Sequence, residues 1–255
     1  MNENGRIIAP TAQEIQRRFK SPAVVISRPV ILGAIGVLRA ARRFGWNGEG
    51  LSNIKNLDGP IVFAANHQSH TDTAAILGTL PKRMRDRTAV AAALDVFGGN
   101  GTGAPPSLKR ECLQLFVAAG FHAFAFDRHR SPLRSIRTAA ELIENGWNLL
   151  LYPEGTRSRT GKMAQFKAGV GVLARFTQRP VVPIHVAGGR AILPCGATIP
   201  RPGRLTVRYG KPVFFEQGES TAQFTQRIQD CVRNLSPAYK SGSLLPNDKV
   251  QLQQT

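Results

Sequence analysis

The chain has 255 residues, of which 42% are hydrophobic, so it is long enough to bury a sizeable core within one domain. Its 34 Lys and Arg residues exceed its 16 Asp and Glu residues, and the resulting net charge of +18 indicates anionic partners. The three cysteines are odd in number and scattered, which argues against a disulfide scaffold and favours a reducing compartment.

The first apolar stretch, Pro29 to Leu38, is about ten residues long and lies between Arg28 and Arg39. A helix that spans a bilayer needs about 20 apolar residues, so we expect no spanning segment here. The apolar bulk and the flanking arginines predict an interfacial helix on the cytoplasmic face of a membrane, bound peripherally to its anionic surface. An ordinary packed helix fits the pattern equally well. About the first 20 residues are polar and are expected to be peripheral.

The strand predicted at 61–65 runs into a sequence in which four residues separate a histidine, His67, from an aspartate, Asp72. An aspartate at this spacing can fold back and accept a hydrogen bond from the imidazole, which leaves the other ring nitrogen free to take a proton. Such a pair supplies a general base but no nucleophile from the protein. A hydroxyl of the substrate is therefore the predicted nucleophile. On spacing alone, Asp72 could instead cap a helix that begins near Thr73.

Two later apolar runs end in charged and polar residues, and a third contains a proline. These sequences are Phe126-Asp127-Arg128, Glu154-Gly155-Thr156-Arg157-Ser158 and Val182-Pro183-Ile184. An arginine in a turn after a strand suits phosphate recognition, because a guanidinium binds phosphate with two parallel hydrogen bonds. Pro183 is expected to interrupt the strand predicted at 181–186.

These four boxes, in this order, resemble those of the glycerolipid acyltransferase family, whose best-known members acylate glycerol-3-phosphate or 1-acylglycerol-3-phosphate. The resemblance covers about residues 55–215. It implies that His67 is the general base, that Asp72 orients it and that Pro183 shapes the acyl-donor side. It also implies a set of residues that holds the phosphate and glycerol of the acceptor: Asp127, Arg128, Glu154, Gly155, Thr156 and Arg157.

Lys167 is a further candidate for contact with the phosphate or the donor, the alternative being a solvated surface lysine. The sequence Gly169 to Ala174 superficially fits a dinucleotide fingerprint. No strand precedes it, so it is better interpreted as a helix whose small residues permit close packing.

The reaction implied by the resemblance moves a fatty acyl group from acyl-CoA or an acyl carrier protein to 1-acyl-sn-glycerol-3-phosphate, which gives phosphatidate. No metal or other cofactor is expected, because a thioester is already activated. The alternatives within the enzyme class are another lysophospholipid, a glycolipid or an amino-lipid acceptor. A different class is a non-catalytic basic protein that binds lipid or nucleic acid, but binding needs neither His67 nor Asp72, and no specific nucleic-acid motif is found.

Predicted strands alternate with predicted helices, which indicates an α/β fold with a central, mostly parallel β-sheet flanked by helices. The strands are predicted at 61–65, 88–92, 122–126, 147–152, 181–186 and 204–209. The helices are predicted at 30–44, 72–80, 107–119, 132–145, 168–178 and 220–234. The predicted division is an N-terminal helical, membrane-interfacial segment (1–48), an acyltransferase domain (49–235) and a polar C-terminal tail (236–255).

Overall fold

The computed structural model describes residues 10–41, 44–93, 120–127, 131–158, 160–194, 197 and 199–237. Within these residues one sheet has the strand order β1-β7-β6-β2-β5-β3-β4, in which β6 and β7 are antiparallel and all other neighbours are parallel. The strands are β1 (Phe44–Glu49), β2 (Val62–Ala65), β3 (Thr88–Ala93), β4 (Ala123–Phe126), β5 (Asn148–Leu151), β6 (Val181–Ala187) and β7 (Gly203–Tyr209). The predicted mostly parallel sheet is therefore confirmed.

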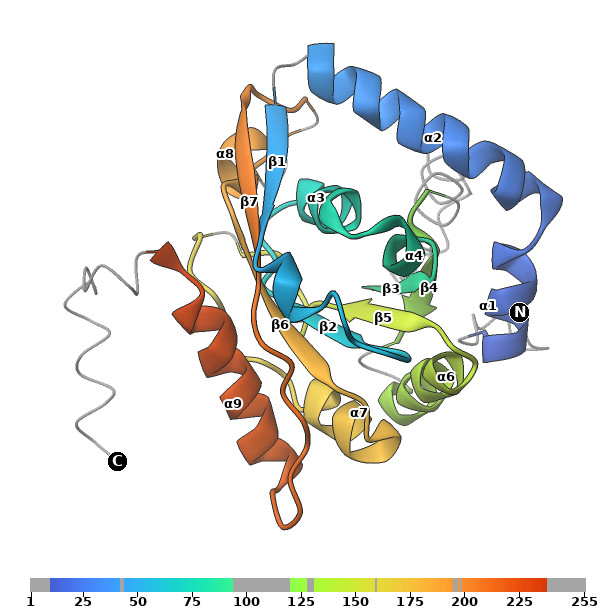
Figure 1. The fold of residues 1–255 in the computed structure, drawn as a ribbon, viewed down its shortest axis with the longest axis vertical. Coiled ribbons are helices and arrows are strands. Elements are labelled where there is room, and N and C mark those ends of the chain that lie inside the picture. Colours follow the sequence, from blue (N-terminus) through green and yellow to red (C-terminus); the bar gives the residue numbers. More distant parts are fainter. Residues whose placement is uncertain are drawn as a thin grey trace, which may run out of the picture.

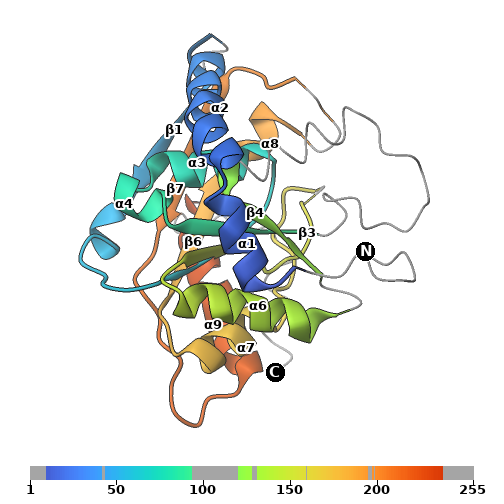
Figure 2. The ribbon, with the colours of Figure 1, turned by 90° about the vertical axis from the view of Figure 1, so that its right-hand side faces the viewer.

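Helices cover both faces of this sheet (Figure 1), and Figure 2 shows the layers from the side. One face carries α1 (Ala12–Phe19), α6 (Pro132–Glu144), α7 (Gly169–Thr177) and α9 (Thr221–Asn234). The other face carries α2 (Pro22–Ala41), α3 (Thr71–Thr79), α4 (Lys82–Arg85) and the short α8 (Gly189–Ile192). A 3₁₀ turn, η1 (Leu51–Asn53), connects β1 to the rest of the sheet. The helix predicted at 107–119 lies outside the described residues.

The central strand β2 shows why the sequence folds into three layers. Val62 and Ala64 pack into the apolar cluster beneath α6, α7 and α9, whereas Phe63 and Ala65 pack into the cluster beneath α3 and α4. Because both faces of a parallel sheet are covered, its strands are continuous apolar runs and lack the alternation of a half-exposed strand. The apolar run that leads to His67 is therefore a buried central strand.

Pro183 lies inside the continuous strand β6, so the prediction that it interrupts the strand was wrong. It pairs with Ala64 of β2, while the ladder with β7 begins one residue later, at Ile184 and Tyr209. The carbonyl of Pro183 accepts the Gly210 N–H (2.8 Å) at the point where β7 ends. The missing N–H of the proline faces this same side, beyond the last pair of the β6–β7 ladder, so it removes no bond from the ladder between β6 and β2.

The N-terminal helix α1 is more closely joined to the domain than the sequence indicates. It begins with a capping box formed by Thr11 and Glu14, which satisfies two backbone N–H groups. Its last residue, Phe19, is buried and stacks on His122 with ring centroids 4.7 Å apart. The expectation that this segment is peripheral was therefore wrong for its described part.

Strand β1 was not predicted, because its sequence contains Gly45 and Gly48 and glycine is depleted in strands. It pairs in parallel with β7 from Phe44 to Glu49 at the edge of the sheet. The predicted division between residues 48 and 49 consequently falls inside a strand of the sheet.

Helix α2 is 20 residues long and is apolar enough to cross a membrane, judged by length and composition alone. The helix is therefore longer than the apolar stretch Pro29 to Leu38, and the expectation that it does not span a membrane stays a prediction. Arg28, which was taken as a boundary, lies inside the helix, where its guanidinium bonds to the Asp86 carboxylate (3.1 Å).

The helix predicted at 168–178 is confirmed as α7, and its small residues do permit close packing. A Cβ added at Gly171 would overlap the carbonyl oxygen of Thr221, in the first turn of α9. A Cβ at Gly169, two residues away, would make an ordinary contact with Ile136 at 3.9 Å. The two glycines therefore form a matched pair for testing the contact between the helices.

Gly171→Ala is expected to lower the free energy of unfolding by about 1–3 kcal/mol, because the backbone of α9 has to move to admit the methyl group. Gly169→Ala, the control, should leave stability unchanged or raise it slightly, since alanine favours helix. Urea denaturation of both variants measures the difference. Equal midpoints for the two variants would contradict the close packing of α7 on α9.

Candidate active site

Asn66 connects the ends of two neighbouring strands directly before the predicted base. Its side-chain amide donates to the Val186 carbonyl of β6 (3.0 Å), and its side-chain carbonyl accepts from the Val186 N–H (2.7 Å). Asn66 is buried, so these bonds are protected from water. They fix the position at which the chain leaves β2 and therefore the backbone position of His67. Sequence analysis missed this role, because the partner lies 120 residues away.

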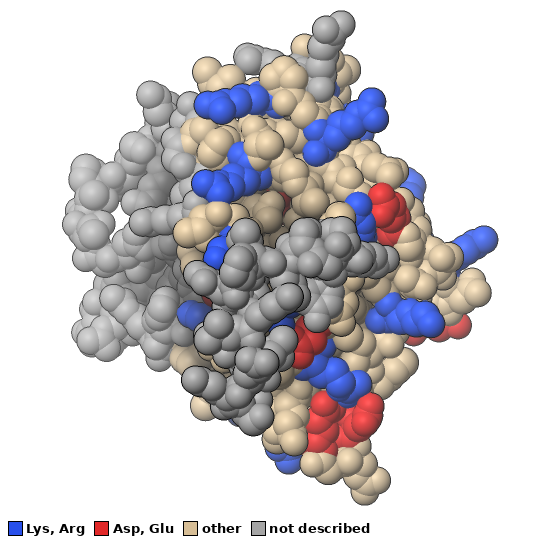
Figure 3. All heavy atoms as spheres, turned by 90° about the vertical axis from the view of Figure 1, so that its left-hand side faces the viewer, with Lys and Arg blue, Asp and Glu red and all other residues tan. Residues whose placement is uncertain are grey.

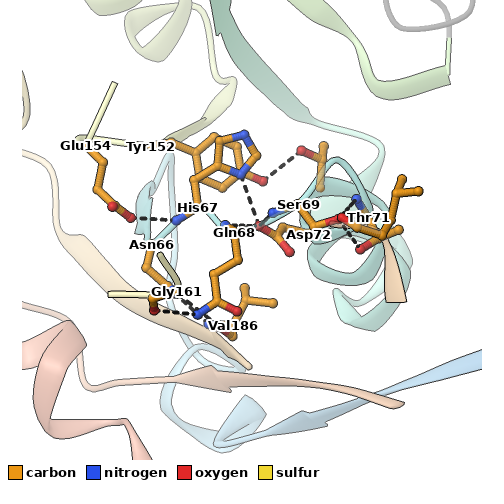
Figure 4. Close-up of polar contacts among 12 residues, drawn as sticks. Asn66, His67, Gln68, Ser69, Thr71, Asp72, Tyr152, Glu154, Gly161 and Val186 are labelled. Carbon is orange, nitrogen blue, oxygen red and sulfur yellow. Dashed lines mark hydrogen bonds and ion pairs between the residues drawn. The ribbon is translucent and has the colours of Figure 1, made fainter. Parts of the chain in front are cut away.

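The structure brings His67 and Asp72 together as predicted (Figure 4): His67 Nδ1 lies 3.0 Å from Asp72 Oδ2. Because a carboxylate only accepts hydrogen bonds, Nδ1 carries the proton and Nε2 is left as an acceptor. Asp72 Oδ2 also accepts the backbone N–H groups of Gln68 (2.6 Å) and Ser69 (2.8 Å). Asp72 is fully buried, whereas the His67 side chain is 16% exposed, so the predicted base is accessible from outside.

Helix α8 closes against the far side of the Asp72 carboxylate. Gly188, the residue before its first turn, has a left-handed backbone (φ 90°). A Cβ added at Gly189 would overlap Asp72 Oδ1. The Ser69 hydroxyl donates to the Leu193 carbonyl (2.8 Å), which ties the histidine turn to the same segment. No sequence motif pointed to Gly189, since the contact depends on how α8 folds back over the turn.

Glu154 has both carboxylate oxygens on backbone donors. One accepts the His67 N–H (2.7 Å) and the other accepts the Ala164 N–H (2.8 Å). Glu154 is buried, and burial raises the pKa of its carboxyl group. The residue was predicted to bind the acceptor; that remains a prediction, and the structure adds a contact that fixes the backbone of the base.

The loop after β5 returns to the histidine turn. The Ser158 N–H donates to the His67 carbonyl (2.8 Å), and Gly155 adopts a left-handed conformation (φ 75°) beneath the Lys167 side chain. Arg157 is half-buried near His70: burial, followed by the Arg157 charge, lowers the pKa of His70 to about 4. His70 therefore stays neutral near pH 7.

Three predicted site residues that the structure describes have other surroundings, and a fourth lies outside the described residues. Asp127 is buried and accepts the Ser131 N–H (3.1 Å) before α6, and Arg128 lies outside the described residues. Pro183 is buried within β6, and Thr156 is exposed in the loop. Contacts of these residues with a substrate remain predictions.

An apolar cavity of about 300 Å³ lies between the sheet and helices α6 and α7. Tyr152 lines this cavity and also stacks on the His67 ring, with centroids 4.0 Å apart. Lys167 is the charged residue among its described lining. The other lining residues are Ala91, Ala93, Phe126, Pro132, Ile136, Ala139, Leu151, Pro153, Gly155, Ala168, Gly169, Val170, Val172 and Leu173. An alkyl chain fits such an apolar lining.

Known proteins resemble this chain in sequence. The family model described as Acyltransferase matches residues 46–187. A chloroplastic 1-acyl-sn-glycerol-3-phosphate acyltransferase of Brassica napus is 28% identical over 169 residues, which are 65% of this chain and 44% of that protein. The enzyme of the same name from Pseudomonas aeruginosa is 27% identical over 219 residues, which are 80% of this chain and 75% of that protein. The chain thus spans about half the length of the plant relative.

A solved structure shares the fold. The 1-acyl-sn-glycerophosphate acyltransferase PlsC of Thermotoga maritima aligns with a TM-score of 0.60, covering 87% of this chain and 86% of that one. The two sequences are 23% identical over the alignment, so the likeness is one of fold.

Gly189→Ala is expected to displace the Asp72 carboxylate and to lengthen or break its bond to His67, because the added methyl group has no space beside Oδ1. The Nδ1 proton signal of His67 in ¹H–¹⁵N spectra, assigned with His67→Ala, should shift or exchange with water. Gly45→Ala is the control, since a Cβ there meets nothing within 4 Å. An unchanged His67 signal in Gly189→Ala would refute the close approach of α8.

Proposed function

The chain belongs to the acyltransferase family, and we propose that it transfers a fatty acyl group from a thioester to the free hydroxyl of 1-acyl-sn-glycerol-3-phosphate, giving phosphatidate. The observation that carries this proposal is the 3.0 Å bond between His67 and buried Asp72 at the carboxyl edge of the sheet. The names of the Brassica and Pseudomonas relatives support the choice of acceptor.

In the proposed reaction, Nε2 of His67 takes the proton of the acceptor hydroxyl while the oxygen attacks the thioester carbonyl carbon. Asp72 holds the ring and stabilises the imidazolium that forms. The tetrahedral intermediate then collapses, the carbon–sulfur bond breaks, and the thiolate receives the proton from the imidazolium. The products are the new ester and the free thiol, so the step needs no cofactor.

Cationic groups support an anionic acceptor and donor. Arg157 and Lys167 come from the loop that encloses His67, and Arg128 is the further predicted contact. Lys and Arg side chains are spread over the described part of the face shown in Figure 3. A phosphorylated acceptor is attracted by such a field, as are both proposed donors, acyl-CoA and acyl carrier protein. We propose the apolar cavity beside Tyr152 as the site of the donor's acyl chain.

His67→Ala is expected to lower turnover by about 10²–10⁴-fold, because the acceptor hydroxyl loses its base. Release of free thiol from palmitoyl-CoA, with and without 1-acylglycerol-3-phosphate, measures turnover. Acceptor affinity, measured by calorimetry, should stay within about twofold, since the variant keeps the cationic groups.

His122→Asn is the control for this variant: it removes a buried histidine beneath α1, and asparagine tolerates the left-handed backbone there (φ 49°). It should keep wild-type turnover. If thiol is released only with other lysolipids, the acceptor is one of those lysolipids and not 1-acylglycerol-3-phosphate. No release from wild type with any acceptor, with either donor, would refute acyl transfer and favour a binding protein.

Helix α2 supports association with a membrane surface. One side contacts the domain: Val24 is buried, Arg28 bonds to Asp86 and Ile35 packs on the core. The other side exposes large apolar residues, at 58–71% of their surface: Val25, Ile26, Val30 and Val37. We propose that this side lies in the cytoplasmic leaflet, parallel to the surface, because a spanning orientation would break the contacts with the domain.

Val30→Asp combined with Val37→Asp should weaken binding to anionic vesicles by at least about tenfold, because two apolar side chains lose their burial in lipid. Flotation at low salt measures this binding. Phe176→Asp is the control, since Phe176 is similarly exposed (65%) on α7, which covers the opposite face of the sheet. Equal flotation of both variants, or no flotation of wild type, would exclude α2 as the lipid contact.

A further inference from the structure

Tyr152 contacts the face of the imidazole whose edge Asp72 holds. The two rings are nearly parallel, at 19°, with centroids 4.0 Å apart, and Figure 4 shows them side by side. A single hydrogen bond to Nδ1 leaves the imidazole free to tilt about that bond. The stacked tyrosine ring removes this freedom, so Asp72 and Tyr152 together fix the direction in which Nε2 points.

The tyrosine ring is itself anchored. Its hydroxyl lies 2.7 Å from the Thr73 hydroxyl, and Thr73 follows Asp72 in the first turn of α3. Burial raises the pKa of Tyr152 well above its ordinary value, so the phenol stays protonated and hydrogen-bonded. One turn of helix therefore controls the base twice, through Asp72 on its edge and through Thr73 and Tyr152 on its face.

We infer that Tyr152 is a positioning residue for His67 and that Thr73 is its anchor. Its kinetic test rests on the proposed function. Proton transfer depends steeply on the placement of the base, and a shift of about 1 Å can cost about 10²-fold in rate. A loosened ring should therefore lower kcat and leave substrate binding largely unchanged.

A second tyrosine–threonine pair, between β7 and α3, supplies the control, and its Tyr209 hydroxyl also donates to the Ile76 carbonyl (3.1 Å). Tyr209 and Thr79 join hydroxyl to hydroxyl at 2.8 Å, at the other end of α3. Burial raises the pKa of this phenol as well, and its ring lies in the core. Loss of this pair should lower stability but should not move His67.

Thr73→Val is expected to lower kcat about tenfold, because it leaves a buried phenol without its partner and the ring must shift. KM for both substrates should stay within about twofold. Tyr152→Phe keeps the stacked ring and should lower kcat by about threefold or less. The Thr73→Val/Tyr152→Phe double variant should recover to the level of Tyr152→Phe, since no unpaired phenol remains.

Thr79→Val and Tyr209→Phe should reduce the melting temperature while kcat stays within about twofold of wild type. If Thr73→Val behaves as these controls do, with a stability change and an unchanged kcat, Tyr152 is merely a core residue and the inference is overturned. Failure of the double variant to recover would also overturn it.

A readout without substrate separates this inference from the proposed reaction. In ¹H–¹⁵N spectra of histidine-labelled protein, the His67 signals should move in Thr73→Val and in Tyr152→Leu, because the ring current of the tyrosine shifts or vanishes. They should stay near their wild-type positions in Tyr152→Phe and in the Tyr209 variant. If wild type lacks turnover but these shifts occur, the positioning role stands and the proposed function fails. Unchanged signals in Thr73→Val would refute the positioning role.

Discussion

The buried carboxylate of Asp72 is the group on which the site depends. A charge without access to water is costly unless several donors surround it, and Asp72 Oδ2 is met by the imidazole and by two backbone N–H groups of the turn. These bonds shape the turn between β2 and α3. The position of the His67 ring and the position of the first turn of α3 therefore depend on each other. Gly189 belongs to the same constraint, because only a residue without a side chain fits beside Oδ1.

The glutamate box contributes to the base as well as to the predicted acceptor site. Glu154 accepts the His67 N–H, and Ser158 donates to the His67 carbonyl, so the loop after β5 holds both backbone groups of the base. Tyr152, directly before this loop, holds the face of the ring. Two boxes that lie far apart in sequence thus form one structural unit, and a substitution in the glutamate box can lower activity without touching a substrate.

The sheet separates the two apolar features that bear on a lipid substrate. Helix α2 lies on the face of α3 and α4 (Figure 2), whereas the lining residues place the cavity between the sheet and helices α6 and α7. His67 lies at the carboxyl edge, where the strands end and both faces can be reached. In the proposed function, a lipid taken up beside α2 meets the base at this edge, while the acyl chain of the donor occupies the cavity.

The sequence by itself determined the strands β2 to β6, because burial on both faces requires continuous apolar runs, and also β7, but it did not reveal the edge strand β1. It also predicted the pairing of His67 with Asp72, because a separation of five positions lets one turn bring the two side chains together. The tertiary structure decided which distant groups meet them. Glu154 reaches the His67 backbone from 87 residues away, Asn66 pairs with β6 across 120 residues, and Tyr152 reaches Thr73 across 79 residues. Such contacts depend on the order and register of the strands, and no local pattern encodes them.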